Sequence, residues 1–358
     1  MNTPFIYLRG LRHAEHTVFG VTNGQKYYRD SQFNKDMAYS SGQQVKRSII
    51  EALDMPFAAI TFNWEIDKKG KAGMKEPHSP CDPTFVDQLV GGYMKAKSDS
   101  YTVKRRSPLS VSAMRPLHPL LGGLERETEP VVFDRSSRPN DHKVVVSRLD
   151  EKGDRVTIPE DELEDWLVSN NRNLGPKYYN GNGQTRASGL FVYDVAIDLR
   201  TLFCVSTNKL EPELFLEIEE KLRAGGWKDG KNIFGNCLIC PKEKRAEIIP
   251  ALANAIINWR ITSNQSRTFS LMETVALAIS DNANQIAYAI RGDLREDSDR
   301  LQAVPKIDEK VKADLFVTPI ASSYIIGSVG SSDALEKAEQ KLIDLMLAFD
   351  YENQLINA

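Results

Sequence analysis

A long irregular stretch between residues 61 and 186 separates two parts of the chain that show regular secondary-structure patterns. The stretch is rich in proline, glycine, serine and lysine, and holds only short strand-like pieces such as residues 144–146. A compact domain rarely needs so long a loop-rich segment unless the segment is functional. We therefore expect residues 1–60 and 188–358 to form one core domain, and residues 61–187 to be an insertion that projects from it.

The regular parts predict an α+β fold. Before the interruption, residues 5–21 suit a strand, residues 22–24 give a hairpin turn signal, and Tyr27 with Tyr28 begins a return strand. Inside the insertion, residues 158–167 favour a short acidic helix. After it, we expect strands over 190–199 and 233–239, paired strands over 274–280 and 285–290, and helices over 211–223, 242–259 and 335–349. The simplest fold with this order is ferredoxin-like, as in RNA recognition motif (RRM) domains, with helices on one face of a sheet.

The clearest helix start in the chain is at Ser40 or Ser41. Either serine can cap the helix, and Gln43 or Gln44, three residues later, can complete a capping box. Apolar residues four apart then form one buried stripe: Val45, Ile49 and Leu53. The polar residues that lie off this stripe are Gln43, Lys46 and Arg47.

Charge is distributed unevenly along the chain. The formal net charge of −3 argues against a protein that coats nucleic acid indiscriminately. Residues 95–148, however, hold eleven Lys or Arg against six Asp or Glu, a net of +5, whereas residues 150–165 hold two basic and eight acidic residues. This segregation indicates one anion-facing surface and one acidic surface. On the counts alone, chance clustering is the alternative explanation.

The cysteines and the known catalytic motifs give no sign of a cofactor. Cys237 and Cys240 have the CxxC spacing of zinc and redox sites, and a structural zinc would need Cys81 and His78 as its second pair. Because Cys237 and Cys240 lie in an apolar run, we expect buried thiols and no metal. The sequence contains neither a phosphate-binding loop nor a GxGxxG or GxSxG motif. His118, with a proline on each side, is either a loop residue or a contact to a phosphate or base.

Localisation follows from the same features. No apolar run reaches the roughly 18 residues that span a bilayer, and the first residues lack the basic-then-apolar order of a signal peptide. Four cysteines in 358 residues also fit a reducing compartment. We therefore expect a cytoplasmic protein with no membrane partner.

Several basic and polar motifs point towards nucleic acid. Lys46 and Arg47 lie in the first turns of the capped helix, where free N–H groups already favour an anion. Further motifs are the cations of residues 104–106, Arg186 after a Tyr-, Asn- and Gly-rich run, and the polar residues 264–267. Each one alone is typical of a solvated surface. Together, on a sheet, they provide the cations and polar loops that a single-stranded nucleic acid requires.

Three segments resemble a known family. Residues 6–10, residues 17–21 and above all residues 40–49, SSGQQVKRSI, resemble the DevR-type CRISPR-associated proteins. These are backbone subunits, the "Cas seven" superfamily, of type I Cascade complexes, and the likeness is to the type I-B kind. The similarity continues through residues 106–110 and, more weakly, along most of the chain.

The resemblance implies an RRM-like palm with large finger- and thumb-like insertions, and a role in antiviral defence. Copies of such proteins stack head to tail along a guide RNA, hold its backbone, and leave its bases to pair with target DNA. The other implied partners are the large subunit, the handle-binding subunit and a nuclease-helicase recruited later. Gripping phosphates makes sense because guide sequences vary whereas phosphates do not.

The motifs and the resemblance together predict the site residues. The expected RNA-binding residues are Ser41, Gln43, Lys46, Arg47, Arg105, Arg106, Arg115, Arg186, Asn264, Gln265 and Arg267. Met114 and Leu117 are the expected wedge side chains of a thumb.

Two other functions remain open. Related backbone subunits of type III complexes cut target RNA with a loop aspartate, for which Asp30 and Asp36 are the nearest candidates. A small-molecule-binding or regulatory protein on the same fold is the third possibility. We expect a non-catalytic RNA-binding scaffold with no cofactor.

Overall fold

A computed structural model covers the 358 residues. It describes residues 4–20, 25–97, 101–126, 131–133, 145–172, 177–179, 185–261, 269–295 and 300–355. Contacts within the chain define a larger unit, Met1–Glu125 with Arg186–Ala358, and a smaller unit, Arg126–Thr185.

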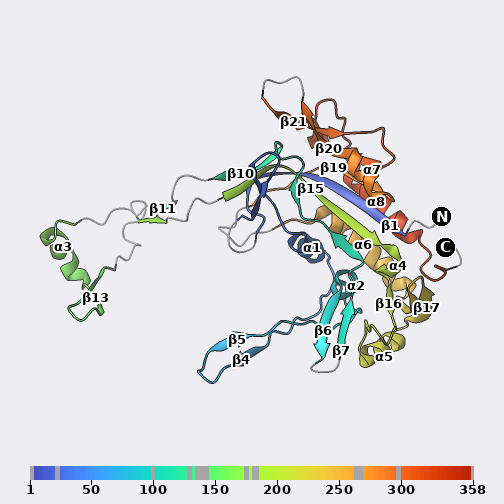
Figure 1. Ribbon diagram of the computed structural model, residues 1–358, viewed down its shortest axis with the longest axis horizontal. Helices are drawn as coiled ribbons and strands as arrows, with labels where there is room; N and C mark the ends of the chain where they lie inside the picture. Colours follow the sequence, from blue (N-terminus) through green and yellow to red (C-terminus); the bar gives the residue numbers. More distant parts are fainter. Residues whose placement is uncertain are drawn as a thin grey trace. The chain divides into compact units, whose positions relative to one another are not determined.

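The larger unit is built on one antiparallel sheet. Its central strand, β1 (Phe5–Thr17), pairs on one side with β15 (Thr185–Asp198) and on the other with β19 (Thr274–Ser280) (Figure 1). β15 continues to β8 (Leu109–Val111), β9 (Arg115–Pro116) and β10 (Gly122–Arg126), and β19 continues to β22 (Asp314–Val317).

Two helices connect these strands in the ferredoxin-like order. Helix α1 (Gly42–Glu51) lies between β1 and β8 in the chain, and helix α6 (Lys242–Asn258) lies between β15 and β19. The sheet order β8-β15-β1-β19 is the one that a split βαββαβ unit produces. The predicted α+β fold class with a ferredoxin-like core is therefore confirmed.

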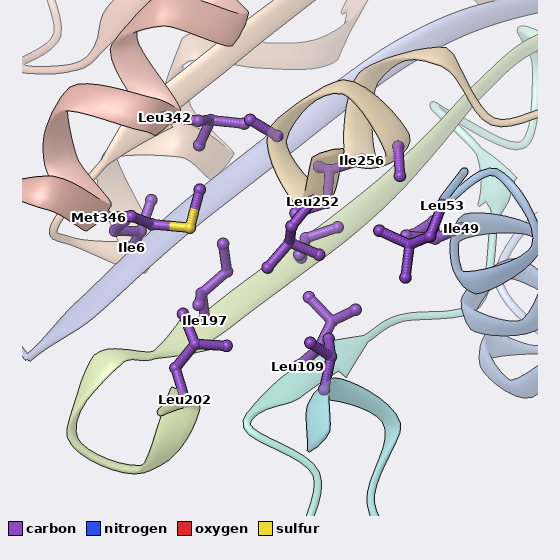
Figure 2. Packing of buried hydrophobic residues seen from close by; sticks show 14 of the residues in the cluster. Ile6, Ile49, Leu53, Leu109, Ile197, Leu202, Leu252, Ile256, Leu342 and Met346 are labelled. Carbon is purple, nitrogen blue, oxygen red and sulfur yellow. The ribbon is translucent and has the colours of Figure 1, made fainter. Parts of the chain in front are cut away.

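One face of the sheet carries the main hydrophobic core. Alternate residues of β1, such as Ile6 and Leu8, point to this face because strand side chains alternate. They meet α1, α6 and the terminal helix α8 (Ala334–Leu347). Figure 2 shows Ile6 and Ile197 from the strands close to Leu252 of α6 and Met346 of α8. Full burial of each such side chain stabilises the fold by about 1.5–3 kcal/mol.

The opposite face is also covered, which the sequence did not predict. Leu277 and Ile279 of β19 belong to the main core, whereas their neighbours Ala276 and Ala278 belong to a second cluster. Helix α7 (Ala283–Ala289) contributes Ile286 to that second cluster. The other elements around it are β20 (Ile290–Arg295), β21 (Gln302–Ile307) and the 3-10 helix η2 (Pro319–Ser323).

Smaller elements complete the two units. In the larger unit they are β2 (Tyr27–Asp30), β3 (Lys35–Ala38), β4 (Trp64–Ile66), β5 (Ala72–Met74), α2 (Val86–Gly91), β6 (Tyr93–Lys97), β7 (Tyr101–Arg105), α4 (Leu199–Leu202), β16 (Cys204–Ser206), α5 (Leu216–Ala224), β17 (Lys228–Asn232) and β18 (Gly235–Ile239). In the smaller unit they are β11 (Val131–Phe133), β12 (Ser147–Leu149), β13 (Arg155–Thr157), α3 (Glu160–Ser169) and β14 (Lys177–Tyr179).

Most predicted elements are present, and two predictions are wrong. Strand β2 pairs with β3 and not with β1, so Tyr27 and Tyr28 do not begin a return strand of β1; the turn at 22–24 lies outside the described residues. Residues 285–290 are mostly helix α7 rather than a strand, because the Asn282 side chain caps the helix by accepting from the Asn284 N–H.

The insertion is organised differently from the expected span of 61–187. Strands β8 and β9 pair with β15, and residues up to Glu125 belong to the larger unit. The smaller unit contains the predicted acidic helix, which is α3.

Candidate nucleic-acid interface

The start of helix α1 is fixed firmly against the sheet. Ser41 is the N-cap, and its Oγ accepts from the Gln44 N–H at 3.3 Å, as the sequence predicted. A Cβ on Gly42 would lie 2.5 Å from the Val111 carbonyl oxygen of β8, so only glycine allows the helix to begin this close to the strand. The predicted stripe of Val45, Ile49 and Leu53 is buried.

The polar residues of α1 divide into an exposed pair and an anchored lysine. Gln43 and Arg47 are exposed and one turn apart. The Arg47 Nε donates to the Glu51 carboxylate at 2.6 Å, but the Arg47 side chain is 59% exposed. An exposed i,i+4 pair contributes only a few tenths of a kcal/mol, so a phosphate can replace the carboxylate.

Lys46 joins α1 to the end of α2. Its Nζ donates to the Gly91 carbonyl oxygen at 2.7 Å. Burial lowers the pKa of Lys46 to about 8, because desolvation disfavours the ammonium form. The contact of Lys46 with a guide phosphate stays a prediction.

Arg115 lies beside the start of α1. The backbone of Met114 exchanges two hydrogen bonds of 3.0 Å with that of Ser40, which directly precedes the cap. The Arg115 side chain is 44% exposed, and its nearest carboxylate, Asp194, lies 3.9 Å away. Asp194 is already bound by Arg9, whose Nε and Nη2 donate to it at 2.6 and 3.0 Å. The Arg115 guanidinium is therefore oriented but still available to an anion.

We define the α1 surface as Ser41, Gln43 and Arg47. Arg115 follows Met114, whose backbone meets Ser40. Its guanidinium, however, lies beside Asp194 and Arg9 on the other face of the sheet, where Arg9 also donates to the Ile290 carbonyl oxygen of β20. Arg106, also predicted, is exposed just after β7 and is not part of this surface.

The structure contradicts the prediction for Arg105. Its side chain is 1% exposed, and its Nη1 lies 3.1 Å from the Glu213 carboxylate. Its nitrogens also donate to the carbonyl oxygens of Leu89, Thr201 and Cys204. Because these contacts occupy the guanidinium, Arg105 stabilises the interior of the larger unit and cannot bind RNA. The basic run 104–106 showed three cations but not which one points inward.

The wedge prediction is also wrong. Met114 is fully buried in the main core, and Leu117 is 8% exposed in the second cluster. A wedge must insert its side chain between bases, and these two side chains already fill protein interior. The reason is that residues 115–116 pair with β15, which sets both neighbours against the sheet.

The remaining predicted residues fall elsewhere. Arg186 lies at the start of β15 and is 8% exposed, which argues against a phosphate contact. Asn264, Gln265 and Arg267 lie outside the described residues, so their contact with RNA stays a prediction.

A ribbon with an exposed apolar face was missed by the sequence analysis, which treated it as loop. Strands β4 and β5 form this two-stranded ribbon. Its exposed apolar residues are Ile60, Phe62, Trp64, Ile66 and Met74. The alternation of apolar and polar residues from 60 to 66, followed by the Asp-Lys-Lys-Gly turn, was the available signal.

The candidate aspartates of the ribonuclease alternative have local structural roles. Asp30 Oδ1 accepts from the backbone N–H groups of Gln32 and Phe33, at 3.1 and 2.8 Å, and so shapes the β2–β3 turn. Asp36 accepts from Arg29 at 3.0 Å. His118 lies nearby, and its Nδ1 accepts from the Leu120 N–H. Burial lowers the pKa of His118, partly opposed by Asp30.

The cysteines are buried thiols, as predicted. Cys237 and Cys240 are each 2% exposed in the main core, and Cys81 lies in a separate cluster. Among the described residues, no three His, Cys, Asp or Glu side chains are placed to hold a metal ion. Within the same part of the chain, no helix is long and apolar enough to cross a membrane.

Two solved structures are similar to this chain. One is titled "CRISPR RNA-guided surveillance complex, pre-nicking"; the match has a TM-score of 0.43, 11% identity, and covers 95% of this chain and 89% of that chain. The other, "CRISPR RNA-guided surveillance complex", has a TM-score of 0.35 and 11% identity, and the match covers 95% of this chain and 84% of that chain. No protein family and no curated protein matches the sequence.

Proposed function

We propose that this protein is a guide-RNA-binding backbone subunit of a Cascade-type CRISPR complex. The α1 surface carries the proposal, because the segment that resembles the family, residues 40–49, forms it. Residues 40–42 fix the start of the helix on the sheet, while Gln43 and Arg47 stay exposed.

The chemistry of the α1 surface suits a phosphate backbone. The guanidinium group of Arg47 can make paired hydrogen bonds to phosphate oxygens, and so can that of the exposed Arg115 on the other face of the sheet. The helix start adds oriented N–H groups and a positive dipole end. Such contacts position a strand without reading its bases. The surface therefore supports binding that is indifferent to guide sequence.

The finer assignment is part of the same proposal. We infer a DevR-type subunit of a type I complex, of the I-B kind, that stacks head to tail along the guide and acts without catalysis. Its guide then pairs with target DNA, and the large, handle-binding and nuclease-helicase subunits are its further partners. Support comes from the sequence resemblance and from the ferredoxin-like core.

The test removes the two exposed guanidinium groups predicted to bind RNA, Arg47 on the α1 surface and Arg115 on the other face of the sheet. Arg47→Ala with Arg115→Ala should weaken binding to two unrelated guide RNAs equally, and should reduce the salt slope by about one to two units. Gel shifts at four salt concentrations measure both effects. The control is Arg223→Ala, because Arg223 is also partly exposed and also forms an i,i+4 ion pair, with Glu219 on α5. An unchanged slope in the double variant overturns the proposal.

A further inference from the structure

The β4–β5 ribbon has two chemically different surfaces. Trp64 and Met74 are directly opposite each other in the register, so they share one face with Ile66 and Phe62. These side chains are 62%, 54%, 74% and 59% exposed, respectively. A two-stranded hairpin is marginally stable by itself. The uncovered apolar face therefore calls for a partner.

The tip of the ribbon is basic. Asp67 closes the turn by accepting from the backbone N–H groups of Lys69 and Lys71, at 2.8 and 2.9 Å. The side chains of Lys68, Lys69 and Lys71 are exposed and form no ion pair with any described residue. The partner of this ribbon must therefore offer negative charge next to apolar surface.

Helix α3 of the smaller unit has negative charge next to exposed apolar side chains. Asp161, Glu164, Asp165 and Val168 are spaced i, i+3, i+4 and i+7, so they lie on one face of the helix. Val168 is 77% exposed, and Leu149 of the neighbouring β12–β13 hairpin is 68% exposed. These carboxylates have no ion-pair partner within the described ranges. Acidic residues in the first turn of a helix interact favourably with the helix dipole. Glu164 and Asp165 lie beyond the first turn, so the dipole does not explain their presence.

We propose that the β4–β5 ribbon of one copy docks on helix α3 of a neighbouring copy. The two surfaces have opposite charge, and each sets its charges beside exposed apolar side chains. Because they are different surfaces, the contact is heterologous and repeats from copy to copy without closing a dimer. The inference rests on the proposed function, since it names the protein contact behind head-to-tail stacking.

A protein partner fits the ribbon better than RNA does. An apolar face of four large side chains is best covered by apolar protein surface, whereas RNA offers apolar area only where a base leaves its stack. The acidic face of α3, for its part, repels phosphate. Charge complementarity of this kind sets partner choice and register in protein interfaces.

Charge reversal with mixing tests the contact. The ribbon variant carries Lys68→Glu and Lys69→Glu, and the helix variant carries Glu164→Lys and Asp165→Lys. On a guide RNA long enough for several copies, each variant alone should bind the second copy at least about tenfold more weakly. An equal mixture should restore stacking, because acidic ribbon meets basic helix and basic ribbon meets acidic helix. Native mass spectrometry counts the copies on each RNA.

The controls separate the possible failures. Lys231→Glu, an exposed reversal on β17, should stack normally, and circular dichroism checks that each variant is folded. Normal stacking by the folded single variants overturns the inference. A mixture of the two variants that does not restore stacking also overturns it, because a contact inside one copy would give that result. If the ribbon variant alone loses binding of a short, one-copy RNA, the ribbon binds RNA instead. If unaltered protein fails to bind any guide, the proposed function itself fails.

Discussion

At the scale of single residues, buried Arg12 holds the end of helix α6. Its guanidinium donates to the carbonyl oxygens of Ile257 and Trp259, both at 2.6 Å, and lies 4.2 Å from the centre of the Trp259 ring. Burial lowers the pKa of Arg12 to about 10, which still leaves it charged at neutral pH. The cation thus satisfies carbonyls that the helix leaves open.

Replacing Arg12 should therefore destabilise the protein strongly. Arg12→Met removes both hydrogen bonds and should lower the free energy of unfolding by about 3–5 kcal/mol. Arg12→Lys should recover only part of the lost stability, because an ammonium group lacks the planar, two-pronged arrangement of N–H donors of a guanidinium. Urea unfolding measures both, with Arg106→Met as the exposed control. Equal stability of the Met variants at the two positions would show that Arg12 has no such role.

Lys46 gives a pH-dependent prediction. Its folded pKa, lowered to about 8, lies below its ordinary value of 10.5. Between these values the unfolded chain binds more protons than the folded chain, so stability should rise with pH in that window. Relative to Lys46→Met, the wild-type protein should thus gain stability between pH 8 and pH 10.5. Chemical unfolding at several pH values measures the difference, and a flat or falling one contradicts the assignment.

At the scale of elements, Gly42 determines how α1 meets the sheet. In Gly42→Ala the new Cβ would lie 2.5 Å from the Val111 carbonyl oxygen, so the helix start must move away from β8. We expect a loss of about 1–3 kcal/mol of stability and weaker RNA binding. Gly123→Ala is the matched control, since nothing lies within 4 Å of its added Cβ. Thermal unfolding with gel shifts checks both; identical behaviour of the variants would contradict the role of Gly42.

Helices with a cap and a stripe could be predicted from sequence, because both signals are local. Ser41, Val45 and Ile49 predicted α1, and the helix begins after the expected cap, Ser41. Strand partners could not be predicted in this way. Tyr28 pairs with Met37 and not with β1, and no local pattern specifies a partner strand.

For the whole molecule, it also matters that local patterns do not specify distant contacts. This explains which site residues could be predicted from the sequence. The bridge that holds the start of α1 against the sheet joins Ser40 to Met114, residues more than seventy positions apart. Long-range packing also decided that Arg105 and Met114 turn inward while Arg106 and Arg115 stay exposed. The sequence shows which residues are cations, but only the fold shows which of these cations are exposed.

The assembled protein should leave RNA intact. Asp30 and Asp36, the aspartates that a guided ribonuclease would need, are engaged in the β2–β3 hairpin by two backbone N–H groups and by Arg29. We expect a complementary RNA, incubated with guide-loaded protein and Mg²⁺, to stay uncut, and Asp30→Asn to bind guide as the wild type does. Denaturing gels show the result. Cuts at regular intervals that vanish in Asp30→Asn would establish an enzyme in place of a scaffold.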